Sequence, residues 1–186
     1  MEQTKNRTFW TSFTVGLKLL LICTVVAGLV AFVYALTEDV YAKNLQETKN
    51  RAIGEIFSLE APTCTLISED GIPVYLVTDS ETEIGYCVEV ASAGFGGDIV
   101  MMVGYNSDLS VRGVSIVSLS ETPGLGARVN EAGFLAQFEG AQGTLVLGEQ
   151  VDAISGATIS SKAVTDGVNA ATAALQTLLN EKGGAA

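Results

Sequence analysis

The strongest constraint in this sequence is an apolar stretch close to its N-terminus. Residues 19–36 contain no charged side chain, and residues 13–17 continue the apolar character on the other side of Lys18. A helix over residues 19–36 rises about 27 Å, close to the thickness of the hydrocarbon core of a bilayer. We therefore predict a transmembrane anchor over residues 13–36, preceded by a short N-terminal segment, residues 1–12.

The charges that flank this stretch predict its orientation in a membrane. They are Lys5, Arg7 and Lys18 before the apolar core and Glu38 and Asp39 after it. Because basic residues are enriched on the cytoplasmic side, we expect a single pass through the cell membrane, a cytoplasmic N-terminus and export of residues 37–186. A cleavable signal peptide, with residues 40–42 as a poor processing site, is the alternative, and the length of the apolar run favours an uncleaved anchor.

The net charge and the residue types exclude several classes of protein. The formal net charge is −11, so the protein would repel nucleic acid, and we expect no nucleic-acid partner. The chain has no histidine, which excludes Ser-His-Asp and Cys-His hydrolases and metal sites built on imidazole. Cys64 and Cys87 lack Cys-x-x-Cys spacing, which argues against a metal or haem site. They are compatible with one disulfide or with buried thiols, and we favour buried thiols.

The residues after the anchor predict a domain of mixed structure. Residues 37–60 contain helically spaced apolar side chains and predict a linking helix. Runs of β-branched and aromatic residues predict strands over 74–78, 83–90, 99–105 and 111–119, the last two as an antiparallel hairpin. Further predicted elements are a short helix over 130–138, a short strand over 144–147 and an amphipathic helix over 160–180. The predicted fold is an α+β domain with an antiparallel sheet over residues 61–186.

A run of small and hydroxylated residues precedes the last helix. It reads Asp152-Ala153-Ile154-Ser155-Gly156-Ala157-Thr158. Gly156 and Ala157 allow another molecule to approach the backbone closely, and Thr158 holds a hydroxyl near the first turn of the helix. Free N–H groups and the helix dipole favour an anion such as phosphate there. The simpler interpretation is that Ser155, Thr158 or Ser160 caps the helix.

Two glycine-containing loops precede this run in the chain. Residues 94–97, Gly-Phe-Gly-Gly, resemble a phosphate-binding loop, but no helix follows them, which excludes a dinucleotide fingerprint or a P-loop. Residues 121–126, Glu-Thr-Pro-Gly-Leu-Gly, predict a tight turn of type II with Gly124 at positive φ. Gly126 again permits close approach to the backbone, and an ordinary surface turn is the alternative.

These stretches together resemble the flavin-binding domain family, in particular the G subunit of Rnf-type electron-transport complexes. The C subunit of the sodium-translocating NADH:quinone reductase is a relative. The resemblance is carried in order by residues 94–99 running into Val103-Gly104, by residues 121–126, and by the run from Asp152 to Thr158. With the N-terminal anchor, it covers nearly the whole chain. The family often has a basic or histidine-containing lead into its Glu-Thr-Pro-Gly-Leu-Gly loop, where this chain has Ser118-Leu119-Ser120.

The resemblance implies an electron-carrying subunit of a ferredoxin:NAD oxidoreductase complex coupled to ion translocation. It implies an extracytoplasmic domain in which a flavin transferase joins the phosphate of FMN to Thr158. The implied cofactor-binding residues are Ser155, Gly156, Ala157, Thr158 and Lys162 near the phosphate, and Glu121, Thr122, Pro123, Gly124, Leu125 and Gly126 against the isoalloxazine. Asp152 would belong to the sequence that the transferase recognises. The other implied partners are the lipid bilayer and further membrane and redox subunits, and no catalytic residue or metal ligand is implied.

Two alternatives remain. A free-standing, membrane-anchored flavoprotein reductase could use the same attachment, but it would need a substrate pocket with charged anchors, and no arginine cluster is evident. A cofactor-free tethered interaction domain would use residues 155–158 only as a helix cap.

Overall fold

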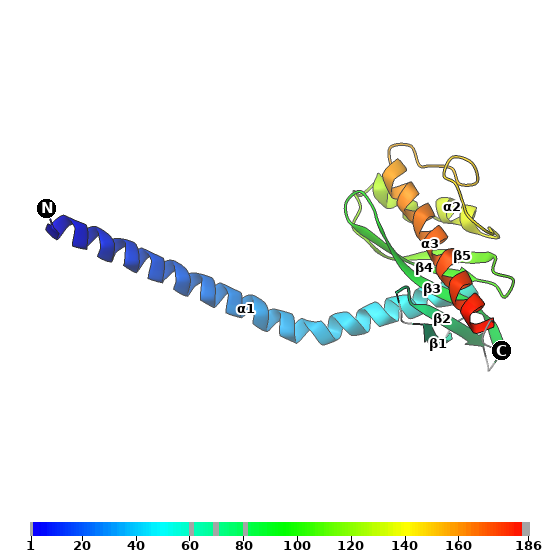
Figure 1. The fold of residues 1–186 in the computed structure, drawn as a ribbon, viewed down its shortest axis with the longest axis horizontal. Helices are drawn as coiled ribbons and strands as arrows, with labels where there is room; N and C mark the ends of the chain where they lie inside the picture. Colours follow the sequence, from blue (N-terminus) through cyan, green and yellow to red (C-terminus); the bar gives the residue numbers. More distant parts are fainter. Residues whose placement is uncertain (1, 60–61, 69–70, 80–81, 184–186) are drawn as a thin grey trace. The chain divides into compact units, whose positions relative to one another are not determined.

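The computed structural model describes residues 2–59, 62–68, 71–79 and 82–183 (Figure 1). The chain divides into two compact units, residues 1–46 and residues 47–186. The first unit is helical, whereas the second contains a five-stranded sheet and a long C-terminal helix. The predicted α+β architecture with an antiparallel sheet is thus confirmed.

Helix α1 (Glu2–Phe57) begins in the first unit and ends in the second. Its segment Val15–Glu38 has a mean hydropathy of 2.7, and none of the apolar window is buried inside the protein, so this segment is long and apolar enough to cross a membrane. Thr24 and Thr37 donate their hydroxyl groups to carbonyl oxygens one turn earlier, which satisfies them within the helix. The predicted N-terminal apolar helix is confirmed, and the side of the membrane that the second unit occupies stays a prediction.

The sheet is an antiparallel meander. Its strands are β1 (Thr63–Ser68), β2 (Val74–Asp79), β3 (Thr82–Ala93), β4 (Asp98–Tyr105) and β5 (Val111–Leu119). They lie side by side in chain order, and the predicted hairpin of β4 and β5 is confirmed. β1 has no counterpart among the predicted runs. None of its 6 residues is buried, so this edge strand lacks the alternation that reveals a half-buried strand in a sequence.

Helix α3 (Thr158–Gly183) covers one face of the sheet (Figure 1). Its buried apolar residues follow the predicted helical spacing and are Val164, Val168, Ala171 and Leu175. Tyr105 on β4 shares a hydrogen bond of 2.9 Å with the Thr172 hydroxyl and donates one of 3.3 Å to the Val168 carbonyl. These bonds satisfy a buried phenol and tie the helix to the sheet, since a buried polar group without a partner is costly.

The last turns of α1 pack on the opposite face of the sheet. Ile53 and Phe57 are buried there with Met102 of β4, whereas the neighbouring Met101 faces α3. The guanidinium of Arg112 lies 5.0 Å from the centre of the Phe57 ring, within cation–π range. The end of α1 is therefore part of the core of the second unit. Our division of the chain into residues 37–60 and 61–186 stays a prediction about its organisation.

Two features of the loops correct the predictions. Residues 144–147 do not form a strand: the described structure there has only one isolated bridge, between Leu147 and Val151. Flanking Gly143 and Gly148 both have positive φ, which breaks an extended conformation. The predicted helix over 130–138 is interrupted at Glu131, whose ψ of 138° is extended. The structure instead has three short helices: η1 (Gly126–Asn130), which ends where the predicted helix begins, and then α2 (Ala132–Leu135) and η2 (Ala136–Phe138).

The cysteines are free thiols. Cys87 is buried on β3 and Cys64 is half-buried on β1. Burial raises the pKa of both thiols, because the charged thiolate loses hydration. Cys87 thus matches the expected buried thiol, whereas Cys64 is only half-buried, and the preference for thiols over a disulfide stays a prediction.

Candidate functional site

Three segments that are distant in the sequence line one pocket of about 310 Å³. They are the β3–β4 loop, the loop after β5, and the first turn of α3 with the residues before it. The lining residues are Phe95, Glu121, Thr122, Leu125, Gly126, Gly156, Ala157, Thr158, Ile159 and Ser160. The two glycine loops and the run before the last helix, which are separate in the sequence, thus belong to one site.

Thr158 is the first residue of α3, and its side chain is exposed. The first turn of a helix has N–H groups without intrahelical partners and the positive end of the helix dipole. Gly156 precedes it with a φ of +81°, and a Cβ at this position would lie 3.0 Å from Leu125 Cδ1. The backbone thus needs glycine here. An anionic group at the Thr158 hydroxyl would lie next to polar donors and a closely packed backbone.

A buried hydroxyl holds the residues just before α3. Ser161 accepts a hydrogen bond of 3.1 Å from the Ile154 N–H and donates one of 3.0 Å to the Ala157 carbonyl. Ser161 is completely buried, so these bonds replace its contact with water. The bend that leads into Thr158 is therefore fixed by a residue of the helix itself.

Two amide side chains hold the loop between η2 and α3. Asn169 on α3 makes two bonds of 2.8 Å to the backbone of Leu145, one to the N–H and one to the carbonyl. Gln137 on η2 accepts a bond of 2.7 Å from the Asp152 N–H and donates one of 3.5 Å to its carbonyl. Each side-chain amide thus pairs with both the N–H and the carbonyl of one loop residue, as the backbone of a neighbouring strand would. Neither residue belongs to a motif that predicts this role, and only Asn169, a polar residue on a helix with a buried face, carries a signal in the sequence.

Glu121 joins the two glycine loops. Its Oε1 accepts hydrogen bonds from the backbone N–H groups of Phe95 at 2.6 Å and Gly96 at 3.3 Å. The residue is 8% exposed, and among the described residues its Oε2 is a buried side-chain oxygen without a hydrogen-bond partner. Buried carboxyl oxygens are normally paired, so this one is an unused acceptor at the wall of the pocket.

The structure separates the predicted site residues into two groups. Seven line the pocket: Glu121, Thr122, Leu125, Gly126, Gly156, Ala157 and Thr158. Pro123 and Gly124 form the exposed turn beside it, and Gly124 has the predicted positive φ, +74°. Asp152 and Ser155 lie outside the lining. Lys162 forms an ion pair with Asp166 one turn further along α3. Phe95, Ile159 and Ser160, which were not among the predicted cofactor-binding residues, line the pocket as well.

Gly126→Ala is expected to destabilise the second unit by about 1–3 kcal/mol, the usual cost of overpacking. A Cβ at Gly126 would lie 2.4 Å from Glu121 Oε2 and 2.9 Å from Ser160 Oγ, and both residues are buried. Gly133→Ala is the matched control, because a Cβ in that position of α2 meets nothing within 4 Å. Urea unfolding followed by circular dichroism measures both, and equal midpoints would contradict the packing described here.

Comparison with known proteins places this site in a family. The FMN-binding domain family matches residues 94–173, which include every residue of the pocket. The G subunit of the ion-translocating oxidoreductase complex of Methanosarcina acetivorans is 36% identical over 166 residues, which cover 82% of this chain and 88% of that protein. The chain belongs to the family of G subunits of ion-translocating oxidoreductase complexes.

Two further proteins are similar to this chain, one in sequence and one in structure. The G subunit of the proton-translocating ferredoxin:NAD(+) oxidoreductase complex of Clostridium ljungdahlii is 30% identical over 177 residues, covering 91% of this chain and 95% of that protein. The crystal structure of Shewanella oneidensis NqrC gives a TM-score of 0.49 at 22% identity, over 64% of this chain and 68% of that chain. The similarity to the G subunits thus extends well beyond the pocket, over most of the chain.

Proposed function

We propose that this protein relays electrons through one FMN, bonded by its phosphate to Thr158, in a membrane-bound ferredoxin:NAD oxidoreductase complex coupled to ion translocation. The observation that carries the proposal is the exposed Thr158 hydroxyl at the first turn of α3, on the wall of a pocket within the range that the FMN-binding family matches. The related proteins of Clostridium ljungdahlii and Methanosarcina acetivorans support the assignment to a complex.

The residues of the pocket fit FMN. A flat, largely apolar ring needs apolar walls, and Phe95, Leu125 and Ile159 provide them. A phosphate needs hydrogen-bond donors, which the first turn of α3 offers. Glu121, whose buried Oε2 has no hydrogen-bond partner, lines the same pocket.

In this proposal the chain's residues bind and orient the cofactor, and FMN supplies the redox chemistry. Ser155, Gly156 and Ala157 lie beside the phosphate. Lys162 leaves its ion pair with Asp166 and binds the phosphate instead. The loop over residues 121–126 borders the ring. Asp152, exposed and held by its backbone, is available to the flavin transferase. A covalent bond prevents loss of the cofactor on the extracytoplasmic side, where no pool of FMN would refill the site.

The proposal includes the placement of the chain in the cell membrane. Residues 13–36 span the bilayer with residues 1–12 in the cytoplasm. Residues 37–60 link this anchor to a flavin domain over residues 61–186 on the extracytoplasmic face, where the other redox subunits of the complex contact it.

Mass spectrometry of the full-length chain, made together with its flavin transferase, tests this function. Residues 129–162 contain no internal lysine or arginine, so trypsin releases Thr158 in a peptide that ends at Lys162. We expect that peptide to carry FMN as a phosphoester on Thr158. An unmodified peptide and a non-fluorescent denatured band would reject the function and favour a cofactor-free interaction domain. Purification of the flavinylated protein from its native membranes without other membrane subunits would favour a free-standing reductase.

A further inference from the structure

Exposed apolar side chains of the second unit gather at the pocket. Phe95 is 71% exposed, Ile159 55% and Leu125 45%, and all three line the pocket. Among the described residues after Glu47, the other large apolar side chains with comparable exposure are Leu66 and Val146. Scattered exposed apolar residues are ordinary, whereas a cluster around one cavity indicates a binding surface.

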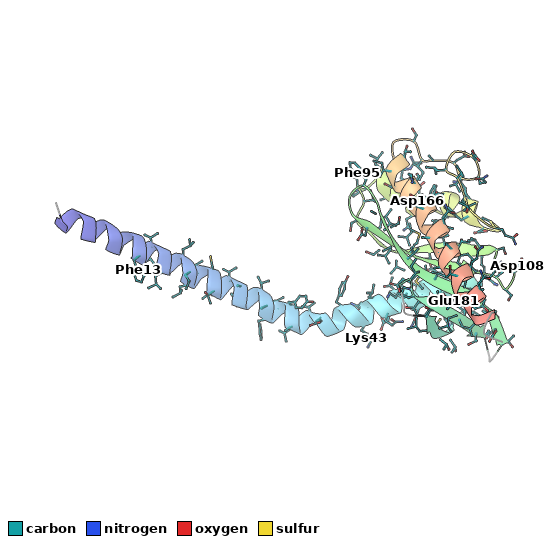
Figure 2. The ribbon with its side chains drawn as sticks, in the orientation of Figure 1. Phe13, Lys43, Phe95, Asp108, Asp166 and Glu181 are labelled. Carbon is teal, nitrogen blue, oxygen red and sulfur yellow. The ribbon has the colours of Figure 1, made fainter. Side chains whose placement is uncertain are left out.

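Phe95 is the exposed aromatic residue in this cluster, and its loop is held by the backbone. The Gly94 N–H donates to the Gly97 carbonyl at 3.0 Å, which closes the turn. The N–H groups of Phe95 and Gly96 both donate to Glu121 Oε1. Figure 2 labels Phe95 near the N-terminal end of α3, where the pocket lies. The ring is thus placed at the pocket without being packed into the core.

The glycines of this loop are required by the same arrangement. A Cβ at Gly94 would lie 2.1 Å from Glu121 Oε1, and one at Gly96 would lie 2.3 Å from the Ser120 carbonyl oxygen. The loop therefore lies directly against the chain that leads into residues 121–126. A carboxylate buried at this contact is costly unless it makes hydrogen bonds, and Glu121 Oε1 makes its bonds with the Phe95 loop.

We propose that Phe95 covers one face of the flavin ring and that Glu121 is the positioning residue that holds the Phe95 loop. This inference rests on the proposed function, because it needs FMN at Thr158. An aromatic ring packs on a flat ring system by offset stacking and removes apolar area from water on both. Phe95 thereby gives the flavin a dry wall, and dry surroundings strengthen the polar contacts that the pocket makes with it.

Fluorescence of the flavinylated full-length chain with Phe95→Trp tests the role of Phe95. An indole in contact with a flavin quenches flavin emission by electron transfer, so the native variant should emit several-fold less than the wild type and recover on denaturation. Val146→Trp is the matched control: Val146 is exposed but lies outside the pocket lining, and its variant should emit like the wild type. The native chain has 1 Trp, so the background is small. Phe95→Tyr, nearly isosteric, also quenches and serves if the Trp variant does not fold.

The role of Glu121 is tested in the Phe95→Trp background. Glu121→Ala releases the loop, so flavin emission should recover while the flavin stays bound. Glu121→Gln keeps an acceptor oxygen for the Phe95 N–H and should keep the quenching. If the peptide of residues 129–162 carries FMN but the Phe95 variants emit like Val146→Trp, Phe95 faces a lipid or protein partner and the inference is wrong. If that peptide carries no FMN in the wild type, the proposed function fails instead.

Discussion

Thr158→Val is expected to abolish flavin attachment in protein made together with its transferase. Valine keeps the β-branched shape of threonine at the start of α3, but it has no hydroxyl oxygen to form the phosphoester. Because Thr158 is exposed, the substitution should change the free energy of unfolding by no more than about 0.5 kcal/mol. Fluorescence of the denatured band on a gel and the visible absorbance of the purified protein both measure attachment.

Thr158→Ser separates the hydroxyl from the rest of the side chain. Serine retains the attacking oxygen, so this variant should keep measurable flavin, whereas the valine variant should show none. Flavin of wild-type intensity on the valine variant would mean that another residue carries the ester. The relay function would then survive, but our placement of the cofactor would be wrong.

Phe57→Ala is expected to cost about 3–5 kcal/mol of stability, a large part of the roughly 5–15 kcal/mol of a typical domain. Phe57 is 2% exposed at the end of α1, where it packs on the sheet and lies under Arg112. Its removal leaves a cavity between the helix and the sheet. Urea unfolding of the detergent-solubilised chain, followed by circular dichroism of the sheet, measures the loss.

Two companion variants locate the origin of this effect. Phe57→Leu retains most of the side-chain volume but loses the aromatic face beneath Arg112. It should destabilise the protein less than Phe57→Ala, because it leaves a smaller cavity. Val146→Ala, on an exposed loop, should change stability by no more than about 0.5 kcal/mol. A Phe57→Ala variant as stable as Val146→Ala would mean that the end of α1 is not part of the core.

The periodic elements of the fold were predictable from the sequence. Strands β2 to β5 and helix α3 bury one face or both, so their apolar residues recur with the period of the element. β1 is an edge strand without a buried residue, and residues 144–147 form a loop held by Asn169. Neither has a local pattern that corresponds to its structure.

The candidate site was predictable in part. The run that ends at Thr158 and the loop over residues 121–126 could be identified because small, hydroxylated and turn-forming residues stand together in each. The structure shows that Phe95 belongs to the same site, because its N–H donates to the carboxylate of Glu121, 26 positions further along the chain. It also pairs Lys162 with Asp166, a partner that the resemblance did not suggest.

The sequence by itself determined the apolar helix, strands β2 to β5, the amphipathic helix and the threonine at the start of that helix. Each depends on composition or on spacing within one segment, which the chain records locally. Only the tertiary structure decided that the end of α1 completes the core and that Glu121 holds the Phe95 loop beside Thr158. These contacts join residues far apart in the sequence, and their geometry depends on how the sheet and α3 pack, which no local period encodes.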